Sequence, residues 1–132
     1  MAALRQAGVD LLVCLLTDAE RAELDLLDEA AAATRAGLEF SSLPIPDFGV
    51  PDHVEADALV SSIVERLGRG QHVAVHCWGG VGRSSLVTAT VMVRLGTGPE
   101  RAWEIISAAR GVRVPEAEAQ RRWLDHHVAQ SG

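Results

Sequence analysis

A cysteine and an arginine, Cys77 and Arg83, lie six positions apart in a segment that is rich in glycine. The segment reads His-Cys-Trp-Gly-Gly-Val-Gly-Arg-Ser-Ser and follows a short apolar run at residues 73–75. A thiolate is a strong nucleophile, and a guanidinium can hold two oxygens of a phosphate group at once. The spacing therefore predicts a loop in which one side chain attacks the group that the other binds.

Three glycines give this loop the properties of an anion-binding site. Gly79, Gly80 and Gly82 accept positive φ angles and carry no Cβ, so backbone N–H groups can converge on one anion. If a helix begins at about Arg83, its N-terminal N–H groups and its dipole point toward the same anion. These surroundings also favour the thiolate form of Cys77. A structural cysteine beside an ordinary glycine turn is the alternative, but it leaves the arginine and the density of glycines unexplained.

The interpretation of residues 86–93 depends on that loop. The segment is rich in β-branched residues, which favours a strand. A strand would remove the amide donors and the dipole from the anion site. We therefore predict a helix that is apolar nearly all round and buried.

The full motif resembles the C-x5-R-S/T signature loop of the cysteine-dependent protein phosphatases, including His76 before the cysteine. It is most similar to the small dual-specificity type, especially the cyclin-dependent-kinase-inhibitor-associated phosphatases. The resemblance implies hydrolysis of phosphate monoesters through a phosphocysteine intermediate, with no metal and no cofactor. Besides the catalytic Cys77 and Arg83, it implies that substrate is bound by Arg83 and by the loop residues Trp78, Gly79, Gly80, Val81 and Gly82.

A general acid is also needed, because displacing an alcohol or a phenol from phosphorus leaves an oxyanion. Residues 43–51, Leu-Pro-Ile-Pro-Asp-Phe-Gly-Val-Pro, resemble the acid loop of the family, which makes Asp47 the predicted acid. Phe48 is predicted to form part of the pocket wall with Trp78. A turn role for Asp47 stays open, because Pro-Asp-x-Gly is a common bend. Asp52 is the second candidate, although an aspartate there also suits the start of a helix.

Three further residues have both a catalytic and a structural interpretation. Ser84 can hydrogen-bond the sulfur of Cys77 and ease its departure from phosphorus, and it can also cap a helix. His76 is predicted to order the loop through its ring nitrogens, or to be a satisfied buried histidine. Gln120 resembles a late glutamine that some relatives use near the attacking water, and without the resemblance it is an exposed helix residue.

The rest of the chain predicts a single α/β domain over residues 1–132, with a small, mainly parallel sheet flanked by helices on both faces. Thr17 and Glu20 have the spacing of a capping box, and Pro51 suits the first position of a helix. Relatives usually carry another strand segment before Leu4, so one edge of the sheet is expected to be incomplete. Strands are predicted at residues 9–16, 38–45 and 73–75, and helices at 18–35, 52–67, 83–93, 99–111 and from 115 onward.

Composition restricts the partners. The formal net charge of −6 argues against a nucleic-acid partner, and no apolar run reaches the roughly 20 residues that span a bilayer. Two cysteines make no disulfide framework, so we expect a cytoplasmic protein that acts on a phosphorylated protein or a small phosphomonoester.

Cys14 is predicted to be a small buried hydrophobic residue, with a disulfide to an oxidised Cys77 as the alternative. His126 and His127 are predicted to lie at a solvated helix end.

Two other functions remain as alternatives. A rhodanese-like or kinase-activating phosphatase-like domain also places a loop after a cysteine, but that group does not rely on an acid loop such as residues 43–51. A non-catalytic domain of the same fold would bind a phosphorylated ligand without turnover. Such a domain needs no nucleophile, so the combination of Cys77, Arg83, Ser84 and Asp47 favours an enzyme.

Overall fold

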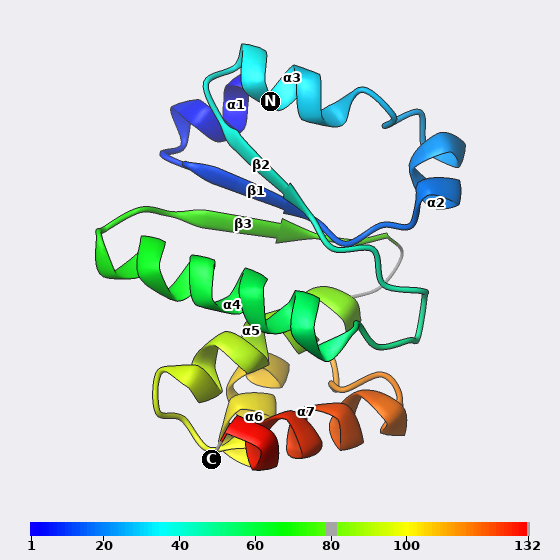
Figure 1. Ribbon diagram of the computed structural model, residues 1–132, viewed down its shortest axis with the longest axis vertical. Helices are drawn as coiled ribbons and strands as arrows, with labels where there is room; N and C mark the ends of the chain where they lie inside the picture. The colour runs from blue at the N-terminus through cyan, green and yellow to red at the C-terminus, as the bar shows by residue number, and fades with distance from the viewer. Residues whose placement is uncertain (79–81, 132) are drawn as a thin grey trace.

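The computed structural model describes residues 1–78 and 82–131, and its centre is a parallel sheet of three strands (Figure 1). The middle strand is β1 (Leu11–Cys14), which pairs with β2 (Glu39–Ser42) and β3 (Val73–His76). The three strands pair without offset, so their carboxyl ends are level. In open α/β sheets, ligands bind in the crevice beyond these ends.

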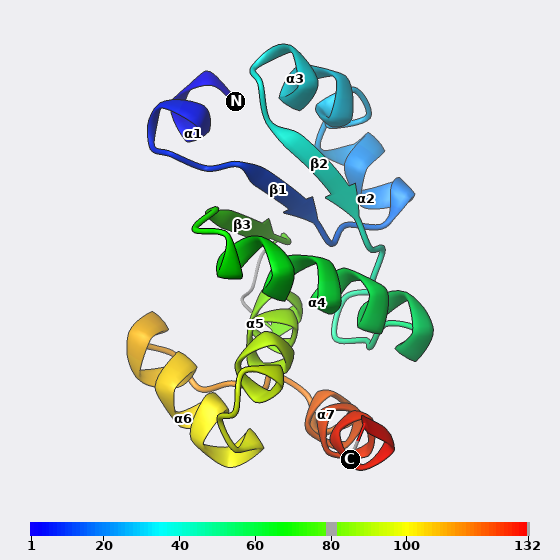
Figure 2. The ribbon, with the colours of Figure 1, turned by 60° about the vertical axis from the view of Figure 1, so that its left-hand side comes forward.

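Two groups of helices lie on opposite sides of this sheet, as predicted (Figures 1 and 2). The three N-terminal helices form one group and the remaining helices form the other. Their bounds are α1 (Ala2–Gln6), α2 (Asp18–Glu23), α3 (Glu29–Arg35), α4 (His53–Gly68), α5 (Gly82–Arg94), α6 (Pro99–Arg110) and α7 (Glu118–Ser131). Within the described ranges, none of these helices is long and apolar enough to cross a bilayer.

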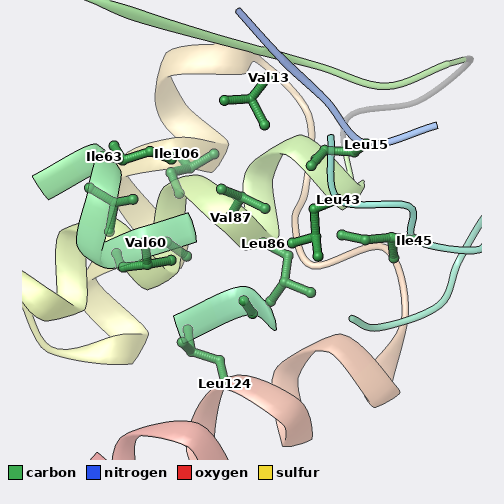
Figure 3. Packing of buried hydrophobic residues seen from close by; sticks show 14 of the residues in the cluster. Val13, Leu15, Leu43, Ile45, Val60, Ile63, Leu86, Val87, Ile106 and Leu124 are labelled. Atoms are coloured by element: carbon green, nitrogen blue, oxygen red, sulfur yellow. The ribbon is translucent and has the colours of Figure 1, made fainter. Parts of the chain in front are cut away.

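The main hydrophobic core lies between the sheet and the second group of helices (Figure 3). Side chains alternate between the faces of a strand, so Val13 and Leu15 point to this core while Cys14 points to the other face. All of β1 is buried, because both faces of the sheet are covered. Leu86 from α5 and Leu124 from α7 belong to the same core and have no exposed surface.

The predicted helix over residues 86–93 is confirmed as part of α5, which packs against α4, α6 and α7. Tertiary packing therefore overrides the β-propensity of this segment. The hydroxyls of Thr88 and Thr90 donate to the carbonyls of Ser84 and Leu86, at 2.8 and 2.7 Å. These bonds satisfy the threonine side chains inside an apolar surrounding.

Several predicted boundaries are wrong. The expected helix over 18–35 is split into α2 and α3, because Asp25 between them adopts a positive φ of 59°, which a helix does not accommodate. Helix α4 begins at His53 and not at Pro51, and Asp52 is its N-cap, since the Asp52 carboxylate accepts from the backbone N–H of Glu55 at 3.0 Å. The last helix begins at Glu118 instead of residue 115.

The helix end that carries His126 and His127 differs from the prediction at one of the two positions. His126 is exposed, as predicted, but His127 is buried. The rings of His53, Trp123 and His127 stack on one another, with centroids 4.6 Å apart for His53 and Trp123 and 4.8 Å apart for Trp123 and His127. The sequence interpretation missed this stack because α4, which carries His53, is about 70 residues away along the chain.

A pair of leucine substitutions tests this core. Leu86→Ala should lower the free energy of unfolding by about 2–5 kcal/mol, because Leu86 is fully buried where the helices meet the sheet. Leu27→Ala is the matched control, since Leu27 is 65% exposed and should cost no more than about 0.5 kcal/mol. Urea unfolding followed by circular dichroism measures both values, and equal midpoints for the two variants would contradict the packing described here.

Candidate active site

The two residues of the predicted signature loop flank the end of the central sheet. Cys77 directly follows β3, is partly buried and packs against the core, while Arg83 is the second residue of α5. The side chain of Arg83 is only 1% exposed. The side chain of Trp78 is partly exposed beside them. Gly79, Gly80 and Val81, which we predict to bind substrate through their amides, lie outside the described residues.

The guanidinium of Arg83 is held by a carboxylate that the sequence interpretation did not assign to the site. Its Nη1 donates to Oε1 of Glu20 at 2.6 Å, and its Nη2 donates to Oε2 of Glu20 at 2.9 Å. Nη1 also donates to the carbonyl of Ile45 at 2.9 Å, and Nη2 donates to the carbonyl of Trp78 at 3.3 Å. These bonds connect the start of α2, the predicted acid loop and the signature loop to one side chain.

The ion pair between Glu20 and Arg83 shifts the pKa of both groups. The hydrogen bond from Arg83 lowers the pKa of Glu20 to about 2, although burial alone would raise it. The same bond raises the pKa of Arg83. Both groups therefore stay charged over the whole neutral range.

The predicted capping box is confirmed, and it aims Glu20 at Arg83. The backbone N–H and the hydroxyl of Thr17 both donate to Oε1 of Glu20 at 3.1 Å, and the N–H of Glu20 donates to Oγ1 of Thr17 at 3.3 Å. Glu20 thus closes the first turn of α2 and binds the guanidinium with the same carboxylate. A carboxylate just after the end of a central strand is the signal that could have assigned it to the site.

Asp47 lies next to Arg83 on a tight turn. Its Oδ1 is 3.6 Å from Nη2 of Arg83, and its side chain is 56% exposed. The backbone N–H of Gly49 donates to the carbonyl of Pro46 at 2.7 Å, so the turn interpretation is confirmed as well. Phe48 in this turn has a φ of 59° and an exposed side chain. A left-handed conformation costs about 1–2 kcal/mol for a residue with a Cβ, and such strain often lies at functional sites.

Arg83 brings the predicted site residues together, because it lies 3.6 Å from Asp47 and donates to the carbonyl of Trp78, the residue that follows Cys77. Ser84 is almost fully buried next to Arg83 in α5. Asp52 has the structural role of capping α4. The ring of His76 is hydrogen-bonded, with its Nε2 2.8 Å from Oε2 of Glu29, which belongs to α3 and not to the signature loop.

Gln120 is fully buried, so its expected exposure as an ordinary helix residue is wrong. Its Oε1 accepts from the backbone N–H of Glu116 at 3.2 Å, and its Nε2 donates to the carbonyl of Gly49 at 3.4 Å. One turn later in α7, Nε1 of Trp123 donates to the carbonyl of Pro51 at 2.9 Å. Helix α7 therefore holds the segment that carries Asp47.

Solved structures define the class of fold. The chain aligns with kinase-associated phosphatase, crystallised with its catalytic cysteine replaced by serine, at a TM-score of 0.87 and 21% identity over 96% of this chain and 72% of that one. It aligns with Tk-PTP in its active form at a TM-score of 0.83 and 27% identity, over 98% and 84% of the two chains. PTPMT1 in complex with PI(5)P aligns at a TM-score of 0.77 and 22% identity, over 98% and 85%. The fold is therefore that of the small dual-specificity phosphatases.

Comparison of sequences gives the family. Cyclin-dependent kinase inhibitor 3 of Rattus norvegicus and of Sus scrofa are 30% and 33% identical to the chain over 83 residues, which is 61% of the chain and 39% of each relative. The chain thus matches less than half of the length of these relatives. A family profile described as "Polymorphic toxin system, DSP-PTPase phosphatase" matches residues 1–97. The chain belongs to this family of phosphatases.

The ion pair between Glu20 and Arg83 predicts a pH-dependent contribution to stability. Glu20→Gln keeps a side chain that can complete the capping box but removes the charge, so it should lower the free energy of unfolding by roughly 3 kcal/mol at neutral pH. A carboxylate whose folded pKa is lowered stabilises the fold above its unfolded pKa, near 4.5, and loses this effect as the pH falls toward about 2. The difference between wild type and Glu20→Gln should therefore shrink over that range.

Denaturant unfolding at a series of pH values measures this difference. Glu23→Gln is the control, because Glu23 is an exposed glutamate in the same helix. A difference between wild type and Glu20→Gln that is the same at neutral pH and near pH 2 would show that the ion pair does not carry the effect.

Proposed function

We propose that the chain is a protein-tyrosine or dual-specificity phosphatase that hydrolyses phosphate monoesters through a phosphocysteine intermediate on Cys77. The observation that carries this proposal is the meeting of Cys77, Arg83 and Asp47 beyond the carboxyl ends of the strands. Nucleophile, phosphate ligand and proton donor are the three groups that the reaction needs. Membership of the phosphatase family supports the same assignment.

The first step forms the bond between sulfur and phosphorus. The thiolate of Cys77 attacks phosphorus, the bond from phosphorus to the leaving oxygen breaks, and Asp47 gives its proton to that oxygen. In the second step Asp47, now a carboxylate, takes a proton from a water that attacks the phosphocysteine. Phosphate leaves, and the thiolate is regenerated with Ser84 donating a hydrogen bond to its sulfur.

Binding of the phosphate requires a rearrangement at Arg83. Its Nη atoms already donate to Glu20 and to the carbonyls of Ile45 and Trp78. The contacts of Nη2 with the Trp78 carbonyl, at 3.3 Å, and with Asp47, at 3.6 Å, are the longest. A phosphate dianion is a stronger acceptor than a neutral carbonyl, so it displaces these two contacts while Glu20 keeps the guanidinium in place.

The substrate pocket is formed by the signature loop and two exposed aromatic side chains. The amides of Gly79, Gly80, Val81 and Gly82 are the proposed ligands of the phosphate oxygens. Phe48 is 59% exposed and Trp78 is 40% exposed, and they belong to the two segments that Arg83 connects. We assign them to the wall that contacts the organic part of the substrate.

A phosphorylated protein is the proposed substrate class, with a small phosphomonoester as the other form. PTPMT1 was crystallised with a phosphoinositide, so a lipid substrate has to be weighed. The chain has a net charge of −6 and contains no lysine, which disfavours an anionic membrane surface. The proposal includes action in the cytoplasm, by one catalytic domain that spans residues 1–132 and needs neither metal nor cofactor for the reaction.

Turnover of p-nitrophenyl phosphate tests the proposed roles. Cys77→Ser should abolish turnover, because the hydroxyl is a far weaker nucleophile than the thiolate. Asp47→Ala should lower kcat by about 10²–10⁴-fold, the usual contribution of a general acid. Asp18→Ala is the control, because Asp18 is an aspartate whose side chain is 91% exposed, and its turnover should be unchanged.

The same assay separates the enzyme from a non-catalytic binding domain of this fold. A wild-type chain that binds a phosphopeptide but releases no nitrophenol would favour the binding domain and overturn the proposal. A trapping experiment with Cys77→Ser and a panel of phosphotyrosine, phosphoserine and phosphothreonine peptides then gives the preferred substrate.

Gln120 keeps its predicted role near the attacking water, and its contact with Gly49 adds a role in positioning the acid loop. Gln120→Ala should lower kcat by on the order of 10-fold to 100-fold, because small misplacements of catalytic groups cost that much. Gln130→Ala is the control on the exposed face of the same helix. A pre-steady-state burst of nitrophenol would assign the defect to the water step, whereas a slow first turnover would assign it to the acid loop. An unchanged kcat would contradict both roles.

A further inference from the structure

Three side chains with metal-binding groups meet at the end of the sheet, outside the residues that the proposed reaction uses. Cys14 ends β1, His76 ends the neighbouring strand β3, and Glu29 is the first residue of α3. One ligand atom from each residue lies within 4.8 Å of the other two. The three residues come from separate elements, so the tertiary fold creates this cluster.

The carboxylate of Glu29 is the part of the cluster that most needs an explanation. Its side chain is only 4% exposed. Oε2 lies 2.8 Å from Nε2 of His76, but Oε1 is buried and makes no hydrogen bond with any residue in the described part of the chain. A buried carboxylate oxygen without a partner is costly, and such atoms often mark an ion that completes the site.

We propose that Cys14, Glu29 and His76 bind a zinc ion. Sulfur, imidazole nitrogen and carboxylate oxygen are the donor types that zinc takes in proteins, and a thiolate disfavours magnesium and calcium. Two negative charges, from the thiolate and the carboxylate, balance the charge of the ion. Oε1 of Glu29 then gains the partner that it lacks among the described residues.

The protons of this step balance simply. Zinc binds the thiolate of Cys14, so binding converts the thiol to a thiolate and releases its proton to solvent. Nε2 of His76 carries the proton of its hydrogen bond to Glu29, so on zinc binding this proton moves to Nδ1 and the lone pair of Nε2 binds the ion. No change of oxidation state is involved.

The geometry requires only a small adjustment. Ligand atoms around tetrahedral zinc are separated by roughly 3.3–3.7 Å, given bonds of about 2.0–2.3 Å. Nε2 of His76 and Oε2 of Glu29, now 2.8 Å apart, therefore move apart by about half an ångström. Three protein ligands leave a fourth position for water, and the side chain of His76 is 31% exposed, so water can reach it.

A zinc ion at this position would connect three elements directly behind the proposed nucleophile. His76 precedes Cys77, and the carbonyl of His76 accepts from the N–H of Leu15 at 3.0 Å. The ion would therefore fix the ends of β1 and β3 and the start of α3 to one another. Because binding is specific to the folded chain, it should also raise the melting temperature.

Cobalt(II), a spectroscopic substitute for zinc, tests the site by titration of the Cys77→Ser variant. Removing Cys77 excludes the other thiol of the chain, so we expect a thiolate-to-cobalt absorption band in the near ultraviolet that saturates at one metal per chain. The band should disappear when Cys14→Ser is added. Glu29→Gln should weaken binding by at least about tenfold, while Glu23→Gln, at an exposed glutamate, should leave it unchanged.

A thermal shift with zinc chloride gives a second measurement for variants that bind no cobalt. The melting temperature of Cys77→Ser should rise with zinc, and that of Cys77→Ser with Glu29→Gln should rise much less. The proposal is overturned if Cys77→Ser shows neither the band nor the thermal shift, or if both persist after Cys14→Ser. These measurements involve no turnover, so they are independent of whether the chain is a phosphatase.

Discussion

The buried guanidinium of Arg83 is the interaction on which the rest of the site depends. The side chain of Arg83 is 1% exposed. A buried charge is tolerated only when it is paired with an opposite charge and fully hydrogen-bonded. Glu20 supplies the opposite charge, and the carbonyls of Ile45 and Trp78 accept the remaining Nη donors. The same bonds that make the burial possible also fix the positions of three segments around the proposed nucleophile.

The segment that carries Asp47 is held at both ends. Arg83 binds the carbonyl of Ile45 before the turn, and α7 binds the carbonyls of Gly49 and Pro51 after it. The residues between these bonds form a tight turn with Phe48 in a left-handed conformation. A strained turn persists when its surroundings fix both ends, and this turn carries the proposed acid.

Two neighbouring groups of side chains meet at the end of β3. Cys77 belongs to the proposed phosphate site, and the residue before it, His76, contacts Glu29 beside Cys14. Successive side chains of a strand point to opposite faces, so adjacent residues can serve different sites.

The sequence by itself determined what depends on residues close together in the chain. The capping box of Thr17 and Glu20 and the turn at Asp47 were predicted from local patterns, and the helical state of α5 was predicted from the anion-binding loop that precedes it. The tertiary structure decided which groups these residues meet. Glu20 and Arg83 are 63 positions apart, and Gln120 and Gly49 are 71 apart. These contacts depend on how the helices pack on the sheet. Burial by an element that is distant along the chain produces no periodic pattern in the sequence around either contacting residue.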